Sequence, residues 1–186
     1  MGVSAEDFNN DGYVDIVVTT FSGNDFVLLN EGGTGFRRFN LPEVRKPSST
    51  RGHNVMALDY NRNGKVDLIF SQGFRKAFTG GYRLMRNNLA IGPNSHYLLV
   101  RVGNEPSRAI TSINAIVTVH IGTQRLTRRV GGRGAQSGSQ SYIDTVHFGL
   151  GSTAVVTKVT VKWTTGFMVA RTNVRADRVI RFGVGL

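Results

Sequence analysis

The segment DFNNDGYVDIVV, Asp7–Val18, returns along the chain as DYNRNGKVDLIF, Asp59–Phe70. In both copies oxygen-bearing side chains stand at alternate positions, a glycine follows at the sixth position, and an apolar run ends the segment. A spacing that repeats together with its own apolar run marks one supersecondary unit used twice. We therefore expect two related β-units, each opening with a polar loop that leads into a strand.

The alternating oxygens predict calcium loops. Ca²⁺ takes several hard oxygen ligands at about 2.3–2.6 Å, and the glycine lets the chain turn so that they converge. The predicted ligands are Asp7, Asn9, Asp11, Asp15 and the Tyr13 carbonyl in the first loop, and Asp59, Asn61, Asn63, Asp67 and the Lys65 carbonyl in the second. An EF-hand begins in the same way but carries Glu at position 12, where this chain has Val18 and Phe70. These loops are therefore expected to feed strands.

For either loop alone the alternative is an ordinary turn, because turns favour Asp, Asn and Gly. Two copies in register favour calcium. The first loop offers three carboxylates, whereas the second offers Asp59 and Asp67 with Lys65 nearby. Because ligand charge strengthens Ca²⁺ binding, we expect the second loop to bind more weakly.

Beyond the loops, apolar and polar residues alternate with a period of two, which is typical of β-strands. The strand-like segments are YVDIVVTT, VDLIFS, YLLVRV, AIVTVHI, TKVTVKW and DRVIRF. In TKVTVKW the valines and Trp163 fall on one side and the lysines and Thr160 on the other, which predicts a sheet with one solvent-facing side. No segment has a helical period, so we expect an all-β chain.

Two breaks organise the chain. Leu41–Gly52 carries two of the four prolines and is expected to be a loop between the repeats, and AIGPNS, Ala90–Ser95, marks a second boundary. We predict that residues 1–92 hold the two repeats and residues 93–186 a second β domain.

Further segments carry a family resemblance. Each loop is followed by a strand and then by an apolar segment ending in Asn, within FVLLNEGGTGFRRF after the first loop and YRLMRNNL after the second. The first half thus resembles the FG-GAP or VCBS repeats of integrin-type β-propellers. Through NSHYLLVRV, SRAI, SQS (Ser139–Ser141) and VHFGLG followed by VTKVTVKWTTG, the second half resembles the ASPIC/UnbV domain that follows such repeats in cartilage-acidic-protein-like secreted proteins.

The resemblance implies two β-propeller-type repeats followed by a β-sandwich-like ASPIC/UnbV domain, in a protein outside the cell or at its surface. Propellers close with about four to eight blades, and closure removes their exposed strand edges. Two repeats cannot close. If the chain is complete as given, its edge strands must be covered by the ASPIC/UnbV-like domain or by a neighbouring chain. We predict a neighbouring chain, giving either a two-fold dimer or a filament.

Charge is unevenly distributed, since residues 94–186 carry 12 of the 23 Lys/Arg but only 3 of the 12 Asp/Glu. The cations that could pair with phosphate, sulfate or uronate groups are Arg125, Arg128, Arg129, Arg133, Lys158, Lys162, Arg171, Arg175, Arg178 and Arg181. Few aromatics interleave with them, so nucleic acid is not an expected partner. Anionic-glycan binding and a merely solvated basic face both stay open.

Other signals are weak. GGRGAQSG, Gly131–Gly138, fits neither G-x-G-x-x-G nor the Walker spacing and is expected to form a hairpin. The four histidines share no metal-ligand spacing, no serine lies in a nucleophile elbow, and there is no cysteine. We therefore expect no enzymatic activity. No apolar run approaches the roughly 20 residues of a membrane span.

Together these patterns predict a calcium-binding structural or cell-adhesion module that acts outside the cell or on its surface and assembles through exposed strand edges. The alternative is a basic protein that binds an anionic polymer, either a glycan or a nucleic acid.

Overall fold

The computed structural model describes residues 2–20, 23–41, 50–74, 80–89, 92, 94–107, 110–131 and 144–185. Its elements are strands, turns and loops, with no helix among these residues, which confirms the all-β prediction. The described residues divide into two compact units, one drawn from residues 1–8 and 13–89 and the other from residues 9–12, 90–132 and 142–186. The domain boundary after residue 92 stays a prediction, because residues 90, 91 and 93 lie outside the described residues.

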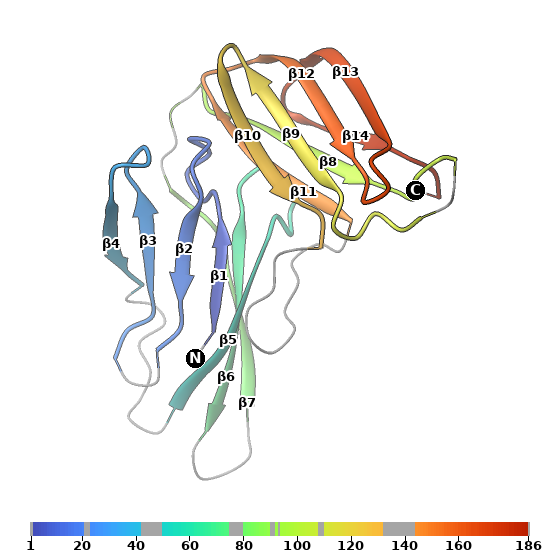
Figure 1. Cartoon of the computed structure of the whole chain (residues 1–186). Helices are drawn as coiled ribbons and strands as arrows, with labels where there is room; N and C mark the ends of the chain where they lie inside the picture. The colour runs from blue at the N-terminus through green and yellow to red at the C-terminus, as the bar shows by residue number, and fades with distance from the viewer. Residues whose placement is uncertain are drawn as a thin grey trace. The chain divides into compact units, whose positions relative to one another are not determined.

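The first unit, which we call the repeat unit, contains two antiparallel sheets (Figure 1). The first sheet holds four strands in chain order: β1 (Val3–Glu6), β2 (Asp15–Val18), β3 (Phe26–Asn30) and β4 (Phe36–Asn40). The second holds β5 (Thr50–Leu58), β6 (Asp67–Phe74) and β7 (Gly80–Met85), also in chain order. Strands that follow one another across a sheet are the arrangement of a propeller blade, so each repeat forms one blade-like sheet.

One apolar core serves both sheets of the repeat unit. Alternate residues of the strands point into it, as the period of two predicts. Its buried members are Phe8, Val17, Val27, Leu29, Val55, Ala57, Val66, Leu68 and Phe70. The apolar runs at the ends of the two quoted segments therefore fold as strands because each supplies side chains to this shared core.

The second unit, which we call the sandwich unit, also has two sheets. One runs in the order β11 (Thr145–Gly151), β8 (His96–Val102), β14 (Arg178–Phe182), and β14 is parallel to β8. The other runs in the order β10 (Gln124–Arg129), β9 (Ile116–Ile121), β12 (Val155–Lys162), β13 (Met168–Arg175), with every pair antiparallel.

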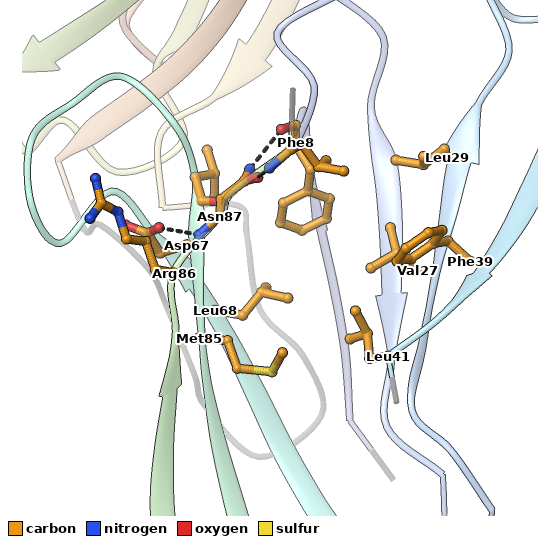
Figure 2. A pocket seen from close by; sticks show the side chains of 12 residues that line it. Phe8, Val27, Leu29, Phe39, Leu41, Asp67, Leu68, Met85, Arg86 and Asn87 are labelled. Atoms are coloured by element: carbon orange, nitrogen blue, oxygen red, sulfur yellow. Dashed lines mark hydrogen bonds between the residues drawn. The ribbon is translucent and has the colours of Figure 1, made fainter. Parts of the chain in front are cut away.

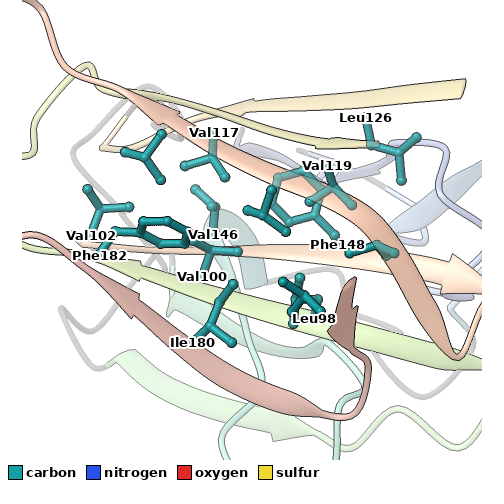
Figure 3. Close-up of a cluster of buried hydrophobic side chains, with 14 of the residues drawn as sticks. Leu98, Val100, Val102, Val117, Val119, Leu126, Val146, Phe148, Ile180 and Phe182 are labelled. Atoms are coloured by element: carbon teal, nitrogen blue, oxygen red, sulfur yellow. The ribbon is translucent and has the colours of Figure 1, made fainter. Parts of the chain in front are cut away.

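The two sheets of the sandwich unit enclose an apolar core (Figure 3). Val117, Val119 and Leu126 come from one sheet, and Val100 and Phe182 come from the other. Figure 3 shows these side chains between the two layers, which is the architecture of a β-sandwich.

Trp163, the residue after β12, belongs to the sandwich core. It is buried, and its indole N–H donates to the Gly103 carbonyl at 3.1 Å. Together with buried Val159 and Val161, it confirms the inward side predicted for TKVTVKW. The indole N–H has a partner, so burying this large side chain leaves no polar group unsatisfied there.

Several predicted features lie outside the described residues. They include most of the loop Leu41–Gly52, nearly all of the glycine-rich segment Gly131–Gly138, Arg133, and the SQS of Ser139–Ser141. At its end the predicted loop is wrong: residues 50–52 are the first residues of β5, because their backbones pair with β6. The predictions for the residues outside the described ranges stand as made.

Candidate metal centre

Each predicted calcium loop joins two antiparallel strands at an equivalent register. The first loop connects β1 to β2, where Glu6 pairs with Asp15, and the second connects β5 to β6, where Leu58 pairs with Asp67. The loops therefore feed strands, as their sequences predict. The second loop lies wholly within the repeat unit, whereas residues 9–12 of the first are assigned to the sandwich unit.

The two loops share their unusual backbone angles. At position 4, Asn10 and Arg62 both have φ of 59°, and at position 6 Gly12 and Gly64 have φ of 94° and 83°. Glycine adopts this left-handed region freely and Asn tolerates it, but for Arg62 it costs about 1–2 kcal/mol. Repetition of the same two left-handed positions shows that the sequence repeat is also a repeat of local structure.

In the second loop the predicted ligand oxygens organise the backbone. The Asp59 carboxylate accepts hydrogen bonds from the Asn63 N–H at 3.0 Å and the Gly64 N–H at 2.7 Å. The Asn61 side-chain oxygen accepts from the Asn63 N–H at 3.1 Å, and the Asn63 oxygen accepts from the Lys65 N–H at 2.9 Å. Because Asp59 and Asn61 share one donor, their oxygens lie on the same side of the loop.

The aspartate at position 9 is a structural anchor in both loops. Asp67 accepts from the Tyr60 N–H at 3.3 Å and the Asn87 N–H at 2.7 Å. Asp15 accepts in the same way from the Phe8 N–H and the Asn30 N–H, both at 2.8 Å. Each carboxylate thus ties the second residue of its own loop to the asparagine that ends a later segment.

Those asparagines, Asn30 and Asn87, are site residues that the ligand prediction did not include. The Asn30 side-chain amide donates to the Val14 carbonyl at 3.1 Å, and that of Asn87 donates to the Val66 carbonyl at 3.0 Å. Asn87 also donates to the Phe8 carbonyl at 2.7 Å, so it links the second repeat to the first (Figure 2). The available sequence signal was the Asn that ends the apolar segment after each loop, Asn30 in FVLLN and Asn87 in YRLMRN.

Electrostatics in the second loop suit a cation. Asp59 and Asp67 are both buried. Burial raises the pKa of Asp67, and the charge of Asp59 raises it further, while the backbone hydrogen bonds from Asn87 and Tyr60 and the charge of Arg86 act the other way. Two buried carboxylates that repel each other are stabilised by a divalent ion. With the amide oxygens of Asn61 and Asn63, the donor set is all oxygen, as Ca²⁺ requires.

In the first loop, Asp7 and Asp15 are buried and Asp11 is exposed. The Asn9 amide donates to Asp11 at 2.9 Å, and the Asp11 N–H donates to the Asn9 oxygen at 3.2 Å. Within the described ranges, no three His, Asp or Glu side chains form a group that could hold a metal. A cation in either loop would therefore need amide and carbonyl oxygens beside the carboxylates.

The two predicted carbonyl ligands stay predictions. The side chain of Tyr13 is exposed, and the Lys65 ammonium donates to the Leu89 carbonyl at 3.0 Å. Neither side chain needs to take part, because the prediction assigns both residues a role through the backbone.

An apolar cavity of about 110 Å³ adjoins the second loop inside the repeat unit (Figure 2). Phe8, Val27 and Leu29 line it from the first repeat, and Leu68 and Met85 from the second. Asp67, Arg86 and Asn87 form its polar end. The anchoring carboxylate of the second loop thus stands between the polar loop and the core shared by the two sheets.

These features define the class of protein. It has blade-like β-repeats, each with an oxygen-rich loop between its strands, and a separate β-sandwich domain. Residues 7–70 match the family model described as FG-GAP-like repeat, and residues 106–185 match the one described as ASPIC and UnbV. The chain therefore combines FG-GAP-like repeats with an ASPIC/UnbV domain, which confirms the resemblance seen in the sequence. Among curated proteins, none matches the chain. The described residues contain no helix that is both long and apolar enough to span a membrane.

Proposed function

We propose that this chain is a calcium-binding structural or adhesion module of an extracellular or cell-surface protein, without catalytic activity. The observation that carries the proposal is the duplicated loop, with the same two left-handed positions and the same anchored aspartate in both copies. FG-GAP-like repeats are often associated with calcium and with proteins outside the cell or on its surface, which supports both parts.

Calcium would act on the fold of the repeat unit. The second loop holds two buried carboxylates, and its Asp67 is bonded to Asn87, which in turn holds the Phe8 carbonyl. An ion that neutralises Asp59 and Asp67 would stabilise these bonds and, with them, the junction between the repeats. No catalytic step is assigned to any residue.

Titration calorimetry on chelator-treated protein tests this part of the proposal. Ca²⁺ is expected to bind with measurable heat and to raise the melting temperature. Magnesium serves as a control, because it demands octahedral geometry and gives up its water reluctantly. Absence of both heat and thermal shift with calcium would contradict the proposal.

Assembly is the second part, and two edge strands support it. Among the described strands, β4 pairs only with β3 and β7 only with β6. Both expose large apolar side chains: Phe36 is 50% exposed and Phe39 47% on β4, and Tyr82 is 86% exposed and Leu84 48% on β7. An unpaired edge with apolar side chains favours pairing with another strand.

Light scattering with and without chelator tests the assembly. We expect a homo-oligomer or a filament in calcium, built through β4 or β7. Charged substitutions on the edge strands, Phe36→Glu and Leu84→Glu, should dissociate it. Val155→Glu provides the control, because Val155 is similarly exposed but lies on β12, which is paired on both sides, by β9 and β13. A monodisperse, folded monomer at high micromolar concentration in calcium would show that no assembly takes place.

A further inference from the structure

The outer side of the sheet β10-β9-β12-β13 is a strongly cationic surface. On three of these strands Leu126, Val119 and Val159 are buried in the sandwich core. Neighbouring residues of a strand point to opposite sides, so the residues next to these three point away from the core. We call this outer side the cationic face. Its members on β10, β9 and β12 are Arg125, Thr127, Arg129, Ile116, Thr118, His120, Lys158, Thr160 and Lys162.

The strand register arranges the cationic face in rows. One row holds Arg125, His120 and Lys158 side by side, because His120 pairs with both of the others. A second row, four residues along the strands, holds Arg129 and Lys162 on either side of Ile116. Standard strand dimensions separate the two rows by about 13 Å and the two cations within a row by about 9–10 Å. Four cations thus occupy the corners of a rectangle.

Threonines fill the space between the two rows. Thr127, Thr118 and Thr160 are neighbours across the strands. The hydroxyls of Thr118 and Thr127 lie 3.2 Å apart, and that of Thr160 donates to the Thr118 carbonyl at 3.5 Å. The surface between the cations is therefore a ladder of hydroxyl groups, which can both donate and accept hydrogen bonds.

None of the carboxylates of residues 94–186 balances the cationic face. Residues 94–186 contain three acidic residues, Glu105, Asp144 and Asp177. Each is engaged elsewhere: Asp144 with Arg101 at 2.8 Å, Asp177 with His96 at 2.7 Å, and buried Glu105 with Thr165 at 2.9 Å. The excess charge of the face is consequently available to a partner.

Other cations in the same half of the chain have different surroundings from these four. Arg171 lies over the Phe182 ring at 4.6 Å, and Arg128 over the Phe148 ring at 5.3 Å. These two guanidinium groups stack on aromatic side chains of the sandwich unit itself. Arg178 and Arg181 belong to β14, in the other sheet. Of the ten cations singled out in the sequence, four therefore form one regular array: Arg125, Arg129, Lys158 and Lys162.

We propose that the cationic face binds a linear anionic polysaccharide, with sulfate or carboxylate groups held by the four cations and sugar hydroxyls held by the threonine ladder. Charge complementarity requires an anionic partner, and repeated anionic groups match a face with repeated cations. The hydroxyl ladder suits a partner that carries hydroxyls along its length. This inference is independent of calcium and of the proposed assembly.

The same face is poorly suited to nucleic acid. None of its four strands contains Phe, Tyr or Trp, so single-stranded bases would find no ring on which to stack. Four strands span about 14 Å between their axes, which is wider than the roughly 12 Å major groove that admits a helix or a two-stranded ribbon. The four-stranded face as a whole therefore does not fit within the major groove.

His120 gives the cationic face a pH response. The pKa of His120 is lowered, first by burial and then by the charges of Lys158 and Arg125. An anionic group bound between those two cations would relieve the repulsion and favour protonation of the imidazole. Polysaccharide binding should therefore strengthen as the pH falls below the ordinary histidine value of 6.5.

The test is heparin binding by titration calorimetry at several salt concentrations, in chelator so that calcium takes no part. The double variant Arg125→Gln/Lys158→Gln is compared with Arg178→Gln/Arg181→Gln, since each removes two of the charges behind the net charge of +11. We expect the first to weaken binding about tenfold and to lower the salt slope by about one to two. The second should leave binding within about twofold of the parent chain.

The pair Arg129→Gln/Lys162→Gln repeats the test on the second row, and circular dichroism verifies that each variant is folded. Desulfated heparin and hyaluronan distinguish recognition of sulfate from recognition of carboxylate. Equal losses in the face variants and the β14 control would overturn the proposal, because they would reflect net charge alone. Tighter binding of an oligonucleotide or of anionic phospholipid vesicles than of heparin would also overturn it, as would absence of heparin binding.

Discussion

The two predicted calcium loops have the same local structure but different charge. Position 4 and position 6 are left-handed in both, and the aspartate at position 9 makes the same pair of backbone hydrogen bonds. The first loop carries three carboxylates, whereas the second carries two and has Lys65 at position 7. The comparison distinguishes two roles within one motif. The aspartate at position 9 holds the loop to its sheet, and the remaining side-chain and carbonyl oxygens determine how strongly a cation binds.

The largest effect is expected from removing the anchoring aspartate. Asp15→Ala leaves the Phe8 and Asn30 N–H groups without their acceptor, and Asp67→Ala does the same to Tyr60 and Asn87. A buried donor left unsatisfied costs about 1–3 kcal/mol, and because only the Phe8 bond is buried and the other three are half-buried, each variant should lose about 2–4 kcal/mol of unfolding free energy. Denaturant titration in chelator measures this loss without any contribution from calcium.

Asp11→Ala is the matched control, because Asp11 is exposed and its carboxylate accepts from the side-chain amide of Asn9, two residues away, whereas Asp15 is buried and holds two backbone N–H groups. Its stability in chelator should lie within about 0.5 kcal/mol of the parent chain. If Asp11→Ala proved as destabilising as Asp15→Ala, the division between anchor and ligand positions would be wrong.

A smaller difference should separate the two asparagines. Asn87→Ala removes donations to two carbonyls, one of which, Phe8, belongs to the other repeat, whereas Asn30→Ala removes one donation, to Val14. Each variant also removes one side-chain acceptor, for the Leu89 N–H and the Gly33 N–H respectively, so the difference lies in the donation to Phe8. We expect losses of about 2–3 kcal/mol for Asn87→Ala and about 1 kcal/mol for Asn30→Ala, measured by denaturant titration. Asn88→Ala, next in sequence, is the control. Equal losses at Asn30 and Asn87 would show that the link between the repeats adds nothing.

The all-β class, the duplicated unit and the two-sided strand TKVTVKW could be predicted from sequence because each depends on local periodicity. The roles of Asp15 and Asp67 could not. Spacing assigns them as ligands, but their bonds to Asn30 and Asn87 depend on how separate strands come together. The cationic face was equally hidden, since Arg125, His120 and Lys158 become neighbours only through the register of three strands.

Charge should set the order of calcium affinities. With one more carboxylate, the first loop should bind Ca²⁺ about tenfold more tightly than the second. Asp11→Asn reduces it to two carboxylates, those of Asp7 and Asp15, and should bring its affinity within a few-fold of the second loop. Calorimetry resolves the two sites, and Asn63→Asp tests the reverse by adding a carboxylate at position 5 of the second loop. Unchanged affinities in both variants would show that charge does not distinguish the loops.

The smallest effect concerns pH and the second loop alone. The pKa of Asp67 is raised above its usual value of 3.8, chiefly by burial and partly by Asp59. The folded chain therefore holds this proton more tightly than the unfolded chain does. The resulting stability is fully present below pH 3.8 and is lost as the pH rises through the raised value. In chelator, the unfolding free energy of the parent chain relative to Asp67→Asn should accordingly fall as the pH rises from about 4 towards 7.

Saturating calcium should reverse that trend. A bound divalent ion favours the ionised carboxylate, so the same difference should then increase with pH. Asp67→Asn is the suitable reference because the amide cannot titrate. Its altered hydrogen bonds change the unfolding free energy by the same amount at every pH, so they do not alter the pH dependence of the difference. Parallel curves with and without calcium would mean that Asp67 does not face the ion, and its place among the ligands of the second loop would have to be given up while its role as an anchor remained.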